Sequence, residues 1–388
     1  MGGIYFFYLL PPPKIYFFIF LLIIAFYRKV RLTDVNVLVL ISIVVFIFFA
    51  QKTISERGSL YNLLGNLIPI LNAYLIIKIL GKRFFRFFVN IVYAFAIIGL
   101  VFWLAENLIP AFNNSIPHLA ARFGTDPGGL DESLILFAYE PNREFGDLII
   151  RNNGGFWEPG AYVTTLIPAL FFCYTLNGIK NIKSLVILLA IITTFSTTGY
   201  LALFVLIIYF ILLSSYKLSS KVGLIILALF ITSFSYYSLD FLSAKIEENI
   251  TFVNQSDLAT GSDGRFLALK KAIYSVGQHP LLGKDFIPHR GEEIDYYAKD
   301  WVGYGWMDLM AKIGLVFFSL YLIINYNFYK RFVKANGRGI NYWLLALLPF
   351  LAQYIVLFGQ ALYAVPLFLV ILVFPLTYKK QTAYELQY

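Results

Sequence analysis

A polar stretch with the sequence RNNGGFWEPG, residues 151–160, places a cation, an acid and two adjacent glycines just before a long apolar run. Pro159 is typical of the first turn of a helix, so we expect a helix to begin there. The free amides of such a helix N-terminus, beside the guanidinium of Arg151, form an anion-binding site. Gly154 and Gly155 would let the backbone approach a bound ligand closely. The stretch therefore predicts a site for an anion.

Glu158 is the acid nearest in sequence to Arg151. One interpretation makes Glu158 a general base beside the anion site. A simpler interpretation is that Glu158 complements the dipole of the following helix while Arg151 binds a lipid phosphate. The residues by themselves leave both interpretations open.

A second stretch, GSDGRFLALKKAIYSVGQHPLLGKDF at 261–286, predicts a short amphipathic helix. Ser262 or Asp263 can cap its first turn, and His279 and Pro280 end it. The expected apolar face consists of Phe266, Leu269, Ile273 and Val276.

Arg265 falls in the first turn of that helix, and Lys270 lies further along it. Two arginines from separate polar regions, Arg151 and Arg265, are what a diphosphate clamp requires, because guanidinium binds phosphate bidentately and stays charged. Arg143 is a further candidate cation in the region that contains Arg151. The simpler alternative is an interfacial helix whose cations face anionic lipid headgroups.

The three histidines, His118, His279 and His289, have no metal-ligand spacing, so we expect no metal. We expect no other cofactor either, and without a phosphate-binding glycine loop of the Walker type the chain is not expected to use ATP. His289 lies among acidic residues and is an alternative candidate base, as are Asp300 and Tyr304.

Hydrophobic residues make up 59% of the chain, far more than a soluble core of 388 residues needs. The apolar runs are long and lack period-two alternation, which selects membrane helices over a barrel. We predict an all-α, polytopic membrane helix bundle of about eleven spans, forming a single integral membrane domain over residues 1–388. The predicted spans lie near 14–27, 35–50, 60–80, 87–105, 157–177, 184–197, 199–215, 222–239, 305–326, 340–358 and 360–378.

The distribution of Lys and Arg predicts the orientation of the bundle, because short cytoplasmic connections are rich in these residues. This pattern explains most of the net charge of +9, so no nucleic-acid partner is expected. Two long loops, 106–156 and 240–304, lie on the opposite side and are expected to face outward and carry the chemistry. The basic connections lie at 28–31, 82–86, 180–183, 217–221, 330–338 and 379–380.

Asp308, Lys312 and Lys78 are charged residues within the predicted spans. Asp308 and Lys312 are four residues apart, so we expect them to pair on one helix face. Lys78 lies near a cytoplasmic helix end and is expected to extend its ammonium toward water.

At these residues the chain resembles the superfamily of O-antigen polymerases and O-antigen ligases, membrane glycosyltransferases of the GT-C type. The resemblance rests on RNNGGFWEPG entering a helix, on the hairpin FSTTGYLAL, on the stretch at 261–286 with its PLLG run, and on GYGWMDLMAKIGLVFF at the start of the next helix. It extends over the whole chain, with the stretch at 261–286 as its most specific part.

The resemblance implies a GT-C-like fold and a substrate carried on undecaprenyl diphosphate at the outer face of a bacterial cytoplasmic membrane. Arg151 and Arg265 match positions where the family places diphosphate-binding arginines. Ligases of the family carry His-Asn at the start of the helix after the second long loop, where this chain has Gly303-Tyr304. This departure favours a polymerase of oligosaccharide repeat units, with Glu158 as the first-choice base.

Two alternatives to the polymerase remain at this point. One is a ligase that transfers finished glycan to lipid A core or another acceptor, and the other is a transporter or flippase with a polar path through the bundle. The expected partners are the lipid-linked oligosaccharide donor and acceptor, the lipid bilayer, a chain-length regulator and a flippase.

Overall fold

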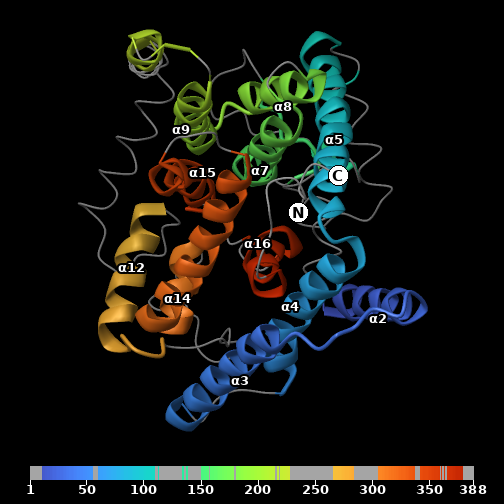
Figure 1. Ribbon diagram of the computed structural model, residues 1–388, viewed down its shortest axis with the longest axis vertical. Coiled ribbons are helices and arrows are strands. Elements are labelled where there is room, and N and C mark those ends of the chain that lie inside the picture. Colours follow the sequence, from blue (N-terminus) through green and yellow to red (C-terminus); the bar gives the residue numbers. More distant parts are fainter. Residues whose placement is uncertain are drawn as a thin grey trace.

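The computed structural model of the protein is a helix bundle (Figure 1). It describes residues 11–55, 60–109, 112, 133–134, 137–138, 150–156, 158–178, 181–214, 216–217, 219–227, 265–283, 305–336, 341–358, 360, 362 and 365–378. The first six helices are α2 (Pro11–Tyr27), α3 (Val35–Ser55), α4 (Leu60–Leu80), α5 (Arg83–Leu108), α7 (Pro159–Asn177) and α8 (Ile182–Thr193). They are followed by α9 (Thr197–Leu213), α12 (Arg265–Gln278), α14 (Gly305–Asn336), α15 (Tyr342–Leu357) and α16 (Pro366–Thr377).

Among the described residues, five helices are long and apolar enough to cross a membrane, namely α3, α4, α5, α7 and α14. Five shorter apolar helices accompany them. Large apolar side chains are exposed along the outside of the bundle, including Phe26 on α2, Phe46 on α3 and Val101 on α5. Such a surface is unfavourable in water and suits hydrocarbon, so the protein is a multi-pass membrane protein.

Ten of the predicted apolar segments coincide with these helices, while the segment at 222–239 lies mostly outside the described residues, so the number of eleven spans stays a prediction. The all-α prediction misses one small feature. Strands β1 (Ser133–Leu134) and β2 (Phe137–Ala138) form an antiparallel pair, and the Phe137 ring stacks on Phe102 of α5 with centroids 5.3 Å apart.

The tight hairpin between α8 and α9 lies earlier than predicted, because α8 ends at Thr193 and α9 begins at Thr197. Ser196 is the N-cap of α9, and its hydroxyl accepts a hydrogen bond from the amide of Gly199 at 3.3 Å. The cap fixes the helix start before the point where the apolar run resumes.

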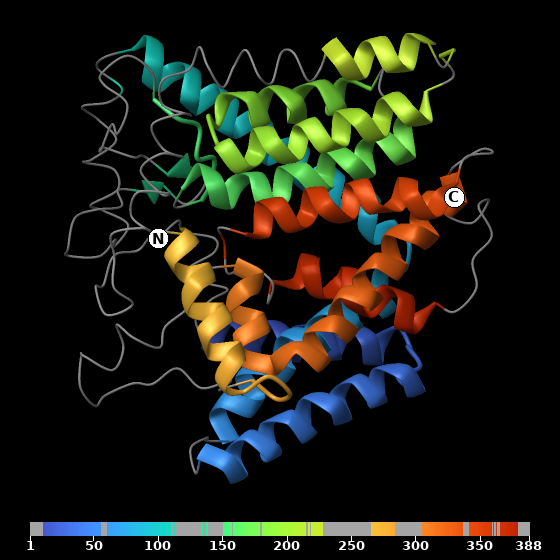
Figure 2. The same ribbon diagram turned by 90° about the vertical axis from the view of Figure 1, so that its left-hand side faces the viewer.

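Two ends of the bundle can be distinguished in Figure 2, where most of the helices run across the picture. At the end that carries the basic connections, called here the basic end, Asn36 donates to the Leu376 carbonyl at 2.9 Å and Arg331 donates to the Pro375 carbonyl at 2.8 Å. At the other end, the loop end, Gln51 of α3 donates to the carbonyls of Leu282 and Lys312 at 2.7 and 2.6 Å. Both predicted long loops attach at the loop end.

An aromatic cluster joins four helices near the basic end of the bundle. Phe85 of α5 contacts Phe172 of α7, Phe328 and Phe332 of α14, and Phe374 of α16, with ring centroids 4.8 to 5.6 Å apart. This packing fixes the relative positions of the helices whose ends form the site described next.

Candidate active site

The segment 150–156, which contains Arg151, is fastened to the loop end of α5. The indole of Trp103 donates to the Ile150 carbonyl at 2.6 Å, and the side-chain oxygen of Asn107 accepts from the Ile150 amide at 3.1 Å. Both backbone groups of Ile150 are therefore satisfied by side chains of a single helix. These two bonds hold the residue before Arg151 in place.

Asn152 fastens the same segment to the end of α8. Its backbone amide donates to the Thr193 carbonyl at 3.0 Å, and its side-chain amide donates to the Thr193 hydroxyl at 2.9 Å. Its side-chain oxygen accepts from the Gly154 amide at 3.0 Å. Because Asn152 is completely buried, each of these bonds replaces one that water would otherwise supply.

Gly154 is required by packing. Its φ is +52°, and a Cβ there would lie 2.7 Å from the ring of Tyr162. Gly99 of α5 approaches from the other side, where a Cβ would lie 3.3 Å from the Gly154 Cα. The glycine thus lets α5, α7 and the segment approach one another, and a contact between Gly154 or Gly155 and a ligand stays a prediction.

Arg151 lies in this fixed segment, Glu158 lies at the start of α7, and both side chains are partly exposed. Arg151 is close enough to Tyr200, in the first turn of α9, for an electrostatic interaction. Glu158 is the N-cap residue of α7, followed by Pro159 as predicted, and its carboxylate makes no capping hydrogen bond. The cation and the acid are therefore carried by a rigid support at the N-terminus of a helix.

Glu106 is an acid at this end of the bundle that the sequence patterns did not single out. It lies one residue before Asn107 on α5, and only 2% of its surface is exposed. A buried carboxylate near a helix end in a membrane protein points to function, and its isolation in an apolar run was the signal that could have revealed it.

The second part of the site is built from α12, the PLLG turn and the beginning of α14. The Gly283 amide donates to the His279 carbonyl at 3.0 Å, which closes the turn. The Leu315 amide donates to the Pro280 carbonyl at 2.8 Å, which joins the turn to α14. Together with the two bonds from Gln51, these contacts lock the turn between α3 and α14.

Three glycines with positive φ allow this assembly. A Cβ on Gly283 would overlap the Lys312 carbonyl, one on Gly305 would overlap the Leu357 carbonyl, and one on Gly314 would lie 2.5 Å from the Leu281 carbonyl. The glycine of the PLLG run is therefore needed because backbone packs directly on backbone.

Gly314, with φ +74° and ψ 171°, divides α14 into two helical pieces. The first piece lies beside α12, and in Figure 2 both run across the direction of α7, α9 and α15. Trp306 in this piece stacks on Phe318 beyond the break, with centroids 5.7 Å apart, and donates to the Tyr354 carbonyl at 3.1 Å. Broken helices at membrane depth occur where protein or a cavity satisfies the freed backbone groups, and here the PLLG turn accepts the hydrogen bond of the Leu315 amide.

The predicted pair in the first piece of α14 is confirmed, since the Lys312 ammonium lies 2.6 Å from the Asp308 carboxylate. The predicted apolar face of α12 is partly wrong. Leu269, Ala272 and Val276 pack inward, while Ile273 is 59% exposed. The first piece of α14 packs against the face of α12 that contains Ala272. The small side chain of Ala272 allows the two helices to approach closely.

The structure leaves part of the predicted site untested. Arg265 begins α12 and Lys270 lies within it, but their side chains lie outside the described residues. In both Figure 1 and Figure 2, α12 begins on the side toward α15 and ends beside α3. Convergence of Arg265 with Arg151 therefore stays a prediction.

The remaining predicted residues, Arg143, His289, Asp300 and Tyr304, also lie outside the described residues. The last three belong to the stretch that leaves the PLLG turn at Gly283 and enters α14 at Gly305. Gly283 packs on Lys312, seven residues along the helix from Gly305, so the two attachment points are about 10 Å apart.

Comparison with known families adds one finding. Residues 183–309 match the family model described as O-antigen ligase. This region resembles an O-antigen ligase. The match covers α8, α9, α12 and the first turn of α14, and it supports a place in the superfamily of O-antigen ligases and polymerases, whose members process glycans in membranes. Comparisons with curated proteins and with solved structures give no match.

Proposed function

We propose that the protein is a membrane glycosyltransferase that polymerises lipid-linked oligosaccharide repeat units of a surface polysaccharide such as O-antigen or capsule. The observation that carries the proposal is the match of residues 183–309 to the O-antigen ligase family. The matched residues include the α8–α9 hairpin against which Asn152 is bonded, α12, the PLLG turn and the first turn of α14. The donor and acceptor are oligosaccharides on undecaprenyl diphosphate.

In the proposed reaction, a hydroxyl of the acceptor sugar attacks the anomeric carbon of the donor from the face opposite the leaving group. The bond from that carbon to the phosphate oxygen breaks as the new glycosidic bond forms, so the configuration inverts. The hydroxyl proton passes to a base, and undecaprenyl diphosphate leaves with its added negative charge. Charge on the leaving group is the main electrostatic problem.

Arg151 and Arg265 are proposed to hold that diphosphate. Arg151 suits this role because its segment is fixed to α5 and α8, so its backbone is positioned before the substrate arrives. Glu158 is the proposed base, since it lies at the start of α7, seven residues after Arg151. A broken α14 beside α12 would receive the glycan.

A ligase is the second candidate, because the matching family model carries the description of O-antigen ligase. The reaction would be the same at the anomeric carbon, with lipid A core or another molecule as acceptor. Gly303-Tyr304, at the position where ligases have His-Asn, argues for the polymerase.

The test uses purified protein with lipid-linked repeat units. A ladder of products on a gel, each longer by one unit, supports the polymerase. A single glycan transfer that occurs only when lipid A core is supplied supports the ligase. Movement of the lipid-linked unit across vesicle membranes without any new glycosidic bond would overturn both and support a flippase.

The proposed location is the bacterial cytoplasmic membrane, with the loop end facing the periplasm or exterior. The only cysteine, Cys173, is buried, so introduced cysteines can report the orientation. A maleimide that cannot cross the membrane should label Gln278→Cys in intact spheroplasts. It should label Lys217→Cys only after the membrane is opened, and the reverse pattern would contradict the orientation.

A further inference from the structure

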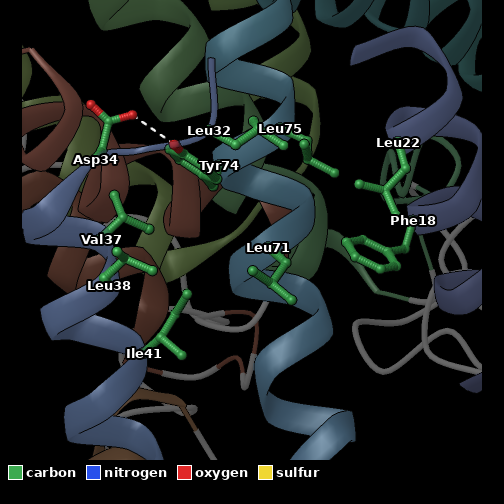
Figure 3. A pocket seen from close by; sticks show the side chains of 10 residues that line it. All are labelled: Phe18, Leu22, Leu32, Asp34, Val37, Leu38, Ile41, Leu71, Tyr74 and Leu75. Carbon is green, nitrogen blue, oxygen red and sulfur yellow. Dashed lines mark hydrogen bonds between the residues drawn. The ribbon is translucent and has the colours of Figure 1, made fainter. Parts of the chain in front are cut away.

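A groove of about 160 Å³ lies between α2, α3 and α4, far from the candidate active site (Figure 3). Leu22, Leu32 and Leu38 on its rim are 37 to 54% exposed, so the groove opens to the outside of the bundle. Its remaining lining residues are Phe18, Asp34, Val37, Ile41, Leu71, Tyr74 and Leu75.

The lining of the groove suits a hydrocarbon chain better than water. Its space would hold about ten water-sized groups, but a buried water needs two to four polar partners. Only Asp34 and Tyr74 offer polar side-chain atoms, and Figure 3 shows them together at one end of the row formed by Val37, Leu38 and Ile41. The rest of the wall is aliphatic or aromatic.

The polar end of the groove is already neutralised. The Asp34 carboxylate accepts a hydrogen bond from the Tyr74 hydroxyl at 2.6 Å and lies 3.0 Å from the Lys78 ammonium. Lys78, which was expected to extend its ammonium toward the basic end, has Asp34 as its partner there. The carboxylate does not present an unbalanced negative charge to a ligand in the groove.

Exposed cations surround this end. The connection between α2 and α3 carries Arg28, Lys29 and Arg31, all exposed, and the same connection contributes Leu32 and Asp34 to the groove. Asp34 is paired with Lys78, and Arg28 donates to the Ile79 carbonyl at 3.4 Å while its side chain stays exposed. Cations beside an apolar groove between membrane helices attract anionic headgroups.

We propose that this groove binds one acyl chain of an anionic phospholipid from the leaflet at the basic end, with the phosphate of the headgroup held by Arg28, Lys29 and Arg31. The apolar wall of the groove contacts the acyl chain, and the three cations favour a headgroup with a net negative charge. This site is separate from the proposed glycosyl transfer, so failure of this proposal would leave that function untouched.

The test measures binding of dioleoyl phosphatidylglycerol and dioleoyl phosphatidylethanolamine to the full-length detergent-solubilised protein by native mass spectrometry. We expect the anionic lipid to bind at least tenfold more tightly. The double variant Lys29→Gln/Arg31→Gln should weaken its binding roughly 30-fold, about fivefold for each lost charge. Binding of the zwitterionic lipid, whose ammonium offsets the charge of its phosphate, should weaken less.

A matched control removes two exposed charges elsewhere at the basic end. Lys217→Gln/Lys334→Gln lowers the net charge by the same amount, away from the groove. It should bind phosphatidylglycerol like the unmodified protein. Equal weakening in both double variants, or no preference for the anionic lipid in the unmodified protein, would overturn the proposal.

A large side chain introduced into the groove tests whether the acyl chain of the lipid binds there. Leu71→Trp should weaken binding of phosphatidylglycerol at least tenfold, whereas Leu104→Trp, at an exposed position on α5, should not. If Leu71→Trp does not yield a monodisperse protein, Ile41→Trp serves instead. Unchanged binding of phosphatidylglycerol to the groove variant would mean that the lipid contacts only the connection between α2 and α3. That result would refute binding of the acyl chain in the groove.

Discussion

The two parts of the candidate active site are held by different kinds of interaction. The segment 150–156 is held by side chains, because Trp103, Asn107 and Asn152 bond its backbone to α5 and α8. The α12–PLLG–α14 assembly is held mainly by backbone packed on backbone at Gly283, Gly305 and Gly314. The first part can be weakened one hydrogen bond at a time, while the second should tolerate almost no change.

The difference agrees with the role proposed for each part. Arg151 and Glu158 need accurate placement for electrostatic catalysis, and a set of hydrogen bonds provides it. The broken α14 instead sets the shape of the bundle where the second long loop attaches, so its geometry is a requirement of the fold.

Gly314→Ala should break the backbone-packed part and have the largest effect. Its methyl group would be forced onto the Leu281 carbonyl at a positive φ, so we expect about 3 kcal/mol of destabilisation and loss of nearly all activity. Thermal unfolding in detergent measures the loss. Gly277→Ala on α12, where no atom lies within 4 Å of the new Cβ, is the control and should be neutral.

Glu158→Gln should abolish polymer growth while the protein stays in the membrane at its normal level. Loss of a general base lowers the rate roughly 10²- to 10⁴-fold. The gel ladder assay measures the rate, and Glu158→Asp should retain part of it. Chains of near-normal length in the Gln variant would exclude Glu158 as the base.

Asn152→Ala tests whether the hydrogen-bonded part positions Arg151. The variant loses the side-chain bonds to the Thr193 hydroxyl and the Gly154 amide but keeps the backbone bond to Thr193, so it should lose about 1 to 3 kcal/mol of stability. It should also lower kcat, because the Arg151 guanidinium is no longer held in place. Asn36→Ala removes a similar bond at the basic end, and an equal fall of kcat in that control would show that stability alone was responsible.

Of the four substitutions predicted here, Lys312→Met should have the smallest effect. Its ammonium pairs with Asp308 at 2.6 Å, but the Lys312 side chain is 31% exposed, so we expect a loss of about 1 kcal/mol. The double variant Asp308→Asn/Lys312→Met should recover part of it in thermal unfolding. A loss as large as that of Gly314→Ala would mean that the ion pair, not the glycine packing, holds the first piece of α14.

Much of the fold could be predicted because lipid, as the surrounding solvent, permits few backbone structures. A chain in hydrocarbon must satisfy its backbone internally, so long apolar runs become helices whose approximate bounds can be predicted. Local rules also held for Pro159 at the first turn of α7 and for the pair of Asp308 and Lys312.

The sequence was a poor guide where contacts between residues far apart in the chain decide which side chains are buried or paired. Ile273 was expected on the buried face of α12, but the partner helix contacts the stripe through Ala272. For Lys78 the sequence indicated only an ammonium that extends toward the basic end, and its partner there, Asp34, lies forty-four residues earlier in the chain. Helical periodicity gives a helix two or more possible apolar faces, and only the neighbour selects one.

The sequence alone determined that the protein is a helical membrane protein, which end of the bundle carries the cations, and that polar residues gather in two stretches between spans. These properties follow from transfer of each segment into lipid and depend on local composition. Only the tertiary structure decided that Asn152 is bonded to Thr193, that Gly283 and Gly314 bring two backbones together, and that α14 is broken. Such contacts depend on which helices become neighbours, because a glycine or an asparagine acquires its role from what lies against it.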